Sequence, residues 1–185
     1  MKKQMIIVSG QPGTGKTTVG KYFAEYFDIA FFDKDIICDD FTFFIMSSIY
    51  GNTHDKDSKD YKDNVRCLEY KTVMNIMKSQ VDLNLSFVMV APFTQEIQNG
   101  STFFDSLLEE SKLREYDVYF IHIKVPPEEL KERIIKRNKP EDKVKIENWD
   151  IYQTRFNENN LKDEVEPFEN YNIDDTIEDI LNYIN

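Results

Sequence analysis

The hydrophobic positions of the chain form short apolar runs, separated by longer stretches with helical spacing. Residues 5–9 form a continuous apolar run that ends at Gly10, as expected for a strand covered on both faces. The pattern predicts strands at 5–9, 29–32, 85–91, 118–125 and 171–173. It predicts helices at 16–28, 36–50, 61–81 and 103–116, one from the Pro126-Pro127 pair, one containing Trp149, Tyr152 and Phe156, and a last one from Thr176 with Asp174 or Asp175 as cap. Strands that alternate with helices indicate a parallel α/β sheet.

Nothing in the sequence divides the chain. No repeat, low-complexity tract or Pro/Gly-rich linker interrupts its 185 residues, so we expect a single domain over 1–185. The longest apolar runs are well short of the roughly 18 residues of a membrane span, and the N-terminal one is too short for a secretory signal. Cys38 and Cys67 do not make a disulfide framework, and neither they nor His54 and His122 have metal-ligand spacing. We therefore expect a reduced, cytoplasmic protein without a membrane partner.

The strongest chemical signal is at residues 10–17, which read GQPGTGKT and match G-x-x-x-x-G-K-[ST] in full. Glycines in such a loop let backbone N–H groups turn toward phosphate oxygens, and the following helix directs its positive dipole end to the same place. The lysine, which we expect to face solvent, can reach the β- and γ-phosphates, and the next hydroxyl can bind Mg²⁺. Because the motif lies between a predicted strand and a predicted helix, we prefer a nucleotide site over a plain glycine-rich turn. The residues expected to bind ATP are Gly10, Gly13, Thr14, Gly15, Lys16, Thr17 and Thr18.

Two classes of P-loop protein are disfavoured by the rest of the chain. A GTPase needs a guanine-reading Asn-Lys-x-Asp, but residues 138–141 end in Glu and follow a charged helix. An AAA-type motor needs acidic residues at the end of the strand beside the P-loop strand, but residues 87–90 lead into Ala91-Pro92-Phe93. A small-molecule kinase needs only an acid near the acceptor, a metal ligand and cations over the phosphoryl group.

Two acids follow the second predicted strand. Asp33 and Asp35 would lie on one side of an extended segment. We assign Asp35 to the acceptor hydroxyl and Asp33 to Mg²⁺, directly or through water, while a helix cap at Asp35 is the plainer alternative. Arg66 is a candidate to hold the acceptor, although a surface salt bridge explains it equally well. Gln95 and Glu96 follow the third strand, where ligands approach an open α/β sheet.

The chain is strongly acidic except in one segment. Its formal net charge of −11 argues against nucleic acid as a partner and requires any phosphate site to be local. Residues 131–145 reverse this charge, with seven cations among fifteen residues. Arg133 and Arg137 are four apart, so they share a helix face and can clamp triphosphate oxygens when a lid closes. The alternative is a solvated helix face on which Glu129 pairs with Arg133.

The order of these features resembles the P-loop small-molecule kinase superfamily, which includes nucleoside monophosphate, shikimate, gluconate and chloramphenicol kinases. The resemblance rests on the P-loop, the Asp-x-Asp after the second strand, PPEELKERIIKR at 126–137 and IDDT at 173–176. Residues 137–149 are also similar to bacterial proteins labelled AAA-domain ATPases. The resemblance implies an α/β P-loop NTPase fold, a three-layer sandwich in which helices flank a five-stranded parallel sheet. It also implies a mobile lid at 131–145, an acceptor site over 36–70, and an adenine contact near Asp174 and Thr176.

Two departures from the superfamily pattern affect what the resemblance implies about metal binding and about the substrate. The third strand ends without an acid, which leaves more of the metal binding to Asp33. The region 36–70 matches no one subfamily, so the substrate stays open.

We therefore predict an ATP-dependent phosphotransferase that moves the γ-phosphate to a hydroxyl or phosphate of a small metabolite, nucleotide or antibiotic. Lys16, Arg133 and Arg137 would stabilise the phosphoryl group. Thr17 and Asp33 would bind Mg²⁺, and Asp35 and Arg66 the acceptor. A nucleotide-binding regulator or an ATPase without small-molecule transfer is the alternative. Both a monomer and a homodimer are compatible with the sequence.

Overall fold

The computed structural model describes residues 2–51, 56–154, 156 and 158–185. His54 and the middle of the polar stretch 51–60 lie outside the described residues. The described part contains a sheet of five parallel strands in the order β2-β3-β1-β4-β5, which confirms the predicted sheet. The strands are β1 (Gln4–Gly10), β2 (Ala30–Asp33), β3 (Phe87–Val90), β4 (Asp117–Lys124) and β5 (Val165–Glu169).

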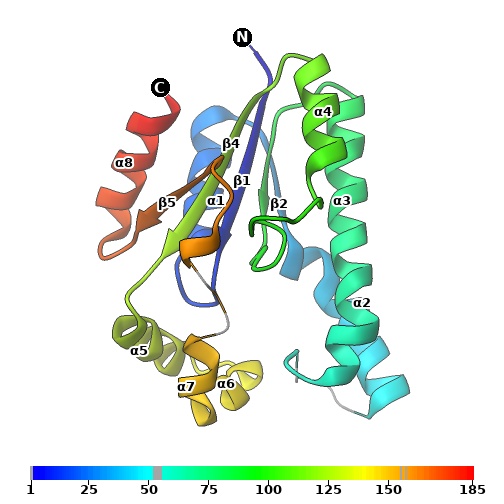
Figure 1. The fold of residues 1–185 in the computed structure, drawn as a ribbon, viewed down its shortest axis with the longest axis vertical. Helices are drawn as coiled ribbons and strands as arrows, with labels where there is room; N and C mark the ends of the chain where they lie inside the picture. The colour runs from blue at the N-terminus through cyan, green and yellow to red at the C-terminus, as the bar shows by residue number, and fades with distance from the viewer. Residues whose placement is uncertain (1, 52–55, 155, 157) are drawn as a thin grey trace.

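Helices cover both faces of the sheet and form the expected three layers (Figure 1). They are α1 (Lys16–Phe27), α2 (Lys34–Tyr50), α3 (Arg66–Asp82), α4 (Asp105–Leu113), α5 (Pro127–Arg137), α6 (Lys143–Glu147), α7 (Trp149–Gln153) and α8 (Ile173–Ile184). Ile6 and Val8 of β1 pack with α1 and α8, whereas Met5 and Ile7 pack with α3 and α4. Successive strand residues point to opposite faces, so a strand buried on both faces is continuously apolar.

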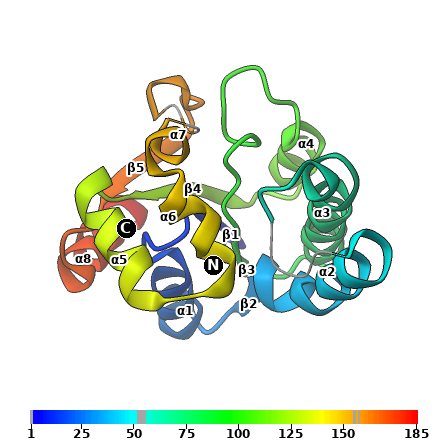
Figure 2. The ribbon, with the colours of Figure 1, turned by 90° about the horizontal axis from the view of Figure 1, so that it is seen from below.

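Helices α5, α6 and α7 lie beyond the carboxyl ends of the strands rather than on a face of the sheet (Figure 1). Leu130 and Ile134 of α5 pack with Trp149 and Tyr152 of α7 in a small core of their own. Viewed from below, these helices are in front of the sheet, and α2 and α3 lie to one side of them (Figure 2). The predicted lid, 131–145, therefore lies over the edge of the sheet from which the P-loop emerges.

The last strand does not lie where the apolar pattern predicts it. It is β5, at Val165–Glu169, and not 171–173. This strand is at the edge of the sheet, contains Pro167, and buries only Val165. Proline is tolerated on an edge strand because no neighbour needs its N–H. An edge strand of this kind lacks the apolar run by which the inner strands were recognised.

The ends of two helices also differ from the prediction. Helix α8 begins at Ile173, and its cap is Asn172, whose side-chain oxygen accepts a 3.0 Å hydrogen bond from the Asp174 N–H. Phe156 lies after the end of α7 and packs against His122 with ring centroids 4.9 Å apart. Helix α8 therefore begins three residues before the predicted Thr176, and α7 ends three residues before Phe156.

The other predicted helices are present, with shifts of a few residues at their ends. The predicted helix 61–81 consists of a π-helical turn, η1 (Tyr61–Val65), followed by α3. In the described part of the chain, no helix combines the length and hydrophobicity needed to cross a membrane.

Candidate functional site

The loop between β1 and α1 has the P-loop position that the sequence predicts, and Asn170 fixes its shape. Gly15 adopts the left-handed conformation with φ of 94°, and a Cβ atom there would lie 2.5 Å from the Asn170 side-chain nitrogen. That nitrogen donates a 2.7 Å hydrogen bond to the Thr14 carbonyl, and Thr14 Oγ1 donates to the Gln11 carbonyl at 2.9 Å. Because the Asn170 side chain lies so close, position 15 must be glycine. Asn170 directly follows β5, so its hydrogen bond also joins the loop to the edge of the sheet.

Of the other residues expected to bind ATP, Gly10 and Thr18 lie at the two ends of the loop, and Gly13 lies against helix α5. Gly10 is the last residue of β1, and Gly13 lies against Ile134 of α5. Thr18 is exposed in the first turn of α1, where its N–H donates to the Gly15 carbonyl at 3.0 Å. The loop is thus bounded on one side by the helix that begins the predicted lid.

Lys16 is buried, contrary to the expectation that its side chain faces solvent. Only 8% of the residue is exposed, and its ammonium donates one long hydrogen bond, 3.4 Å, to the Gln11 carbonyl. Burial lowers the pKa of Lys16 to about 8, although the carboxylates of Asp35 and Asp33 oppose this shift. A desolvated ammonium with so few partners is stabilised by any anion that binds beside it.

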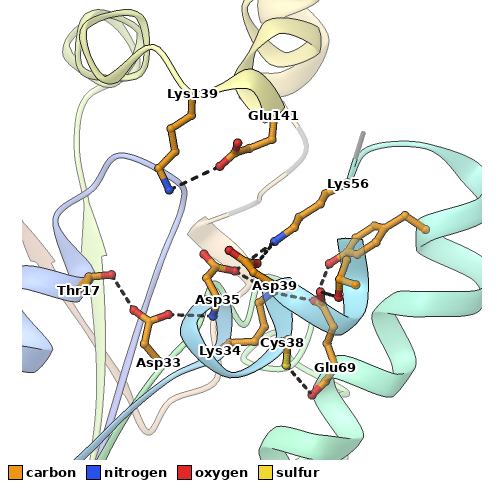
Figure 3. Close-up of polar contacts among 12 residues, drawn as sticks. Thr17, Asp33, Lys34, Asp35, Cys38, Asp39, Lys56, Glu69, Lys139 and Glu141 are labelled. Carbon is orange, nitrogen blue, oxygen red and sulfur yellow. Dashed lines mark hydrogen bonds and ion pairs between the residues drawn. The ribbon is translucent and has the colours of Figure 1, made fainter. Parts of the chain in front are cut away.

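Thr17 and Asp33, the predicted Mg²⁺ ligands, are in contact. Thr17 Oγ1 donates a 2.9 Å hydrogen bond to Asp33 Oδ2, while Asp33 Oδ1 accepts one of 2.8 Å from the Asp35 N–H (Figure 3). The helix cap of α2 is therefore Asp33 and not Asp35. Asp35 lies in the first turn of α2, which corrects the expectation that both acids occupy an extended segment.

Asp35 is surrounded by ammonium groups. Its Oδ1 atom lies 2.9 Å from Lys34 Nζ and 3.5 Å from Lys56 Nζ. Burial by itself would raise the pKa of Asp35, but the charges of Lys34, Lys56 and Lys16 together hold it well below its usual value. Asp35 is therefore ionised throughout the neutral pH range.

Lys34 is fixed from behind by Glu69, whose carboxylate is fully buried. Lys34 Nζ donates a 2.7 Å hydrogen bond to Glu69 Oε2, and the same carboxylate accepts hydrogen bonds from Thr42 at 2.6 Å and Tyr61 at 2.7 Å (Figure 3). Buried charges are tolerated when they are paired and hydrogen-bonded in this way. The hydrogen bonds of Glu69 thus join helix α3 to helix α2 next to Asp35.

Arg66 forms a salt bridge, as the plainer alternative predicted, but this salt bridge is partly buried. Its two terminal nitrogens lie 2.9 and 3.0 Å from the two oxygens of Glu96, and the guanidinium lies over the Tyr70 ring at 4.1 Å from the centroid. Glu96 is only 5% exposed. The loop after β3 therefore fixes the orientation of Arg66.

Arg133 and Arg137 are not brought together. Arg133 makes the pair with Glu129 that belongs to the alternative of a solvated helix face, at 2.5 Å, and donates to the Asn170 carbonyl at 2.6 Å. Arg137 instead forms a two-pronged pair with Asp142 and borders the cleft described below. The structure thus places only Arg137 near Lys16, and the contact of Arg133 with phosphate stays a prediction.

A cleft of about 820 Å³ runs between the P-loop, α2, α3 and the predicted lid. The described cations that line it are Lys16, Lys34, Lys56, Lys62, Arg66, Arg137, Lys139 and Lys145. The described carboxylates that line it are Asp35, Asp57, Asp63 and Glu141. The cleft is cationic in a chain of net charge −11, as a local phosphate site requires.

The residues assigned to adenine lie in the first turn of α8, shortly after β5. Thr176 is 2% exposed, and its hydroxyl donates to the Asn172 carbonyl at 2.8 Å. Asp174 is exposed in the first turn of α8. The Thr176 hydroxyl is therefore used within the turn, and an adenine contact here stays a prediction.

Several residues of the site escape prediction from sequence. Some of them contact partners that are distant along the chain, as Lys34 does with Glu69 and Asn170 with Thr14. Asp142 lies in a turn, where it contacts Arg137 and Lys145. The position of Lys34 between two acids is the one signal in the sequence that could have pointed to any of them.

Solved structures with this fold include several kinases. A sugar kinase from Janibacter sp. is 18% identical, covers 98% of this chain and 94% of its own, and has a TM-score of 0.66. A gluconokinase from Sinorhizobium meliloti is 14% identical, with coverage of 98% and 91% and a TM-score of 0.61. A shikimate kinase from Aquifex aeolicus is 16% identical, with coverage of 98% and 96% and a TM-score of 0.54. At such identities the likeness shows a common fold.

No curated protein matches the chain in sequence. A family model described as AAA domain matches residues 6–160, from β1 to the turn before β5. This match contains the P-loop, the acid pair, the Arg66–Glu96 pair and the predicted lid. The chain therefore belongs to this AAA domain family and has the fold of the P-loop small-molecule kinases.

Proposed function

We propose that the protein is an ATP-dependent phosphotransferase that moves the γ-phosphate of ATP to a hydroxyl group of a small molecule. The observation that carries the proposal is the buried ammonium of Lys16, which lines the same cleft as Asp35 and Arg137. Among the described residues, no carboxylate lies within ion-pair distance of Lys16, so a bound phosphate would supply its counter-charge. The kinases that have this fold support the same class of reaction.

Thr17 and Asp33 would hold the Mg²⁺ that accompanies ATP. A hydroxyl and a carboxylate oxygen 2.9 Å apart are a donor set that suits a hard cation. The described residues contain no group of three or more His, Cys, Asp or Glu that could hold a metal, so phosphate oxygens and water would complete the coordination. When bound, the ion neutralises charge on the phosphates.

The negative charge of Asp35 itself favours a hydroxyl acceptor over a phosphate. An ionised carboxylate accepts a hydrogen bond from a hydroxyl and repels a phosphate. Of the described residues that line the cleft, 33–69 contributes three carboxylates and four cations, so the charges on that side nearly balance, whereas 131–145 contributes one carboxylate and three cations. We infer that the lid side attracts the triphosphate and that the acceptor is hydroxylated and has no net negative charge.

The proposal is tested by ADP release from MgATP in the presence of hydroxylated compounds that share a skeleton but differ in charge, such as glucosamine, glucose and gluconate within a broader library. We expect neutral or amine-bearing compounds to accelerate ADP release by about tenfold or more over the acceptor-free rate, since a well-placed acceptor replaces water. If no compound accelerates ADP release, transfer is contradicted and an ATPase or regulator is favoured. If carboxylate compounds are the best acceptors, only the charge inference fails.

Replacing Lys16 with Met should abolish transfer and stabilise the nucleotide-free protein. Since the pKa of about 8 in the folded protein lies below the usual lysine value of 10.5, the buried charge lowers stability most below pH 8, and this effect disappears as the pH rises through 10.5. At pH 7 the free energy of unfolding should rise by about 1–3 kcal/mol, and the gain should shrink above pH 8. Chemical denaturation of the wild type and the variant at several pH values measures this difference in the free energy of unfolding. A loss of stability at pH 7 would contradict the burial of an unpaired charge, and unchanged turnover would contradict the nucleotide site.

Asp35→Asn and Asp33→Asn should impair transfer in different ways. Asp35→Asn should lower kcat by roughly 10²–10⁴-fold, with little change in ATP affinity, because the acceptor loses its charged partner. Asp33→Asn should raise the Mg²⁺ concentration needed for half-maximal rate, because an amide is a poorer ligand. Asp40→Asn, an exposed position on α2, is the matched control and should behave like wild type. If extra Mg²⁺ rescues Asp35→Asn and not Asp33→Asn, the two roles are reversed.

A further inference from the structure

One fully buried carboxylate lies behind the cations of the predicted lid. Asp142 is 0% exposed and lies in the turn η2 (Pro140–Asp142) between α5 and α6. The guanidinium of Arg137 donates to both of its oxygens, with Nη2 2.5 Å from Oδ1, and Lys145 Nζ lies 3.1 Å from the same Oδ1. Asp142 thereby connects the last residue of α5 to α6.

Both partners of Asp142 line the cleft that contains Lys16. The charge of Arg137 contributes to the lowered pKa of Lys16, so the two cations act on the same region. Burial alone would raise the pKa of Asp142, but Arg137 and Lys145 keep it below its usual value. The carboxylate is therefore ionised, and it cancels part of the positive charge that would attract ATP.

The hydrogen bonds of Asp142 leave donors for a ligand. A guanidinium has five N–H donors, and the two-pronged pair of Arg137 uses two of them. An ammonium has three donors, and Lys145 uses two of them, on Asp142 and on the Glu141 carbonyl at 2.8 Å. Fixing both side chains before binding reduces the conformational entropy that binding must remove.

We propose that Asp142 is a positioning residue, which holds Arg137 and Lys145 so that their remaining N–H donors meet the phosphates of ATP. This inference rests on the proposed function. Asp142 does not touch the nucleotide, and its effect passes through the two cations. The charge of Asp142 weakens the net attraction of the lid for phosphate, but its hydrogen bonds fix the orientation of the two cations.

Asp142→Asn separates positioning from charge because the two effects have opposite signs. The substitution makes the lid more positive by one charge, so charge alone would make ATP bind more tightly. Loss of positioning makes ATP bind more weakly, by about tenfold or more, since an amide accepts only weaker hydrogen bonds and directs its own N–H groups at the two cations. Glu147→Gln, at an exposed position of α6 that lies 4.0 Å from Lys143, makes the same change of charge and is the matched control.

The experiment is calorimetric titration of MgATP into the wild type, Asp142→Asn and Glu147→Gln, with thermal unfolding and Trp149 emission measured on each. Trp149 is the only tryptophan in the chain and lies in the core shared by α5 and α7, so its emission reports whether these helices are packed. We expect a loss of affinity for Asp142→Asn alone, with unchanged Trp149 emission. Equal or tighter binding by Asp142→Asn overturns the proposal.

A second variant keeps the proposal testable if Asp142→Asn disrupts the packing around Trp149. Arg137→Lys keeps the charge and a pair with Asp142 but loses the two-pronged geometry. We expect it to weaken MgATP binding by about fivefold or more with packed helices, and wild-type affinity overturns the proposal. Failure of the wild type to bind MgATP overturns the proposed function as well, whereas binding that is insensitive to Asp142→Asn and Arg137→Lys overturns the positioning role alone.

Discussion

All five strands of the sheet are parallel, so their carboxyl ends meet at one edge, and a part of the site follows each of these ends. The P-loop follows β1, Asp33 ends β2, Glu96 follows β3, the predicted lid follows β4, and Asn170 follows β5. Ligands of open α/β sheets bind at this edge because it is where loops from neighbouring strands converge. Segments separated by more than a hundred residues thus form one cleft. The shape of the P-loop itself depends on this convergence, since Asn170 donates to the Thr14 carbonyl.

The cleft is cationic although the chain is acidic, and buried carboxylates make this possible. Glu69 holds Lys34, Glu96 holds Arg66, and Asp142 holds Arg137 and Lys145. Such pairs add little net stability, because desolvation offsets most of the attraction, but they fix where each cation points. Lys16 is different, since among the described residues its ammonium contacts only the Gln11 carbonyl, through a long hydrogen bond. Of the described cations that line the cleft, the one without an ion pair to a described carboxylate is thus the one that the motif assigns to the β- and γ-phosphates.

Much of the fold can be predicted from the sequence, because parallel strands buried on both faces are continuously apolar and the helices between them have a periodic apolar stripe. The P-loop can also be predicted, as can the nearness of Thr17 and Asp33 that a shared Mg²⁺ ion implies, since a local motif and the end of a strand define their positions. Strand β5 cannot be recognised in the same way, because an edge strand with Pro167 buries only Val165. The burial of Lys16 and the pairs Lys34–Glu69, Arg66–Glu96 and Arg137–Asp142 depend on tertiary packing, which leaves no periodic signal. For the same reason Arg133 and Arg137, although one helical turn apart, have different partners.

The central claim is that this edge of the sheet is a single phosphoryl-transfer site, and the most direct test is a crystal structure with Mg²⁺ and a non-hydrolysable ATP analogue. The measurement is the position of the γ-phosphorus and of the metal. The predicted result has the metal bonded to Thr17 Oγ1 near Asp33, with the γ-phosphate beside Lys16 and facing Asp35 across the cleft. A nucleotide bound instead in the smaller hollow of about 350 Å³ that Trp149 and Phe156 line, or a γ-phosphate directed away from Asp35, would contradict the claim.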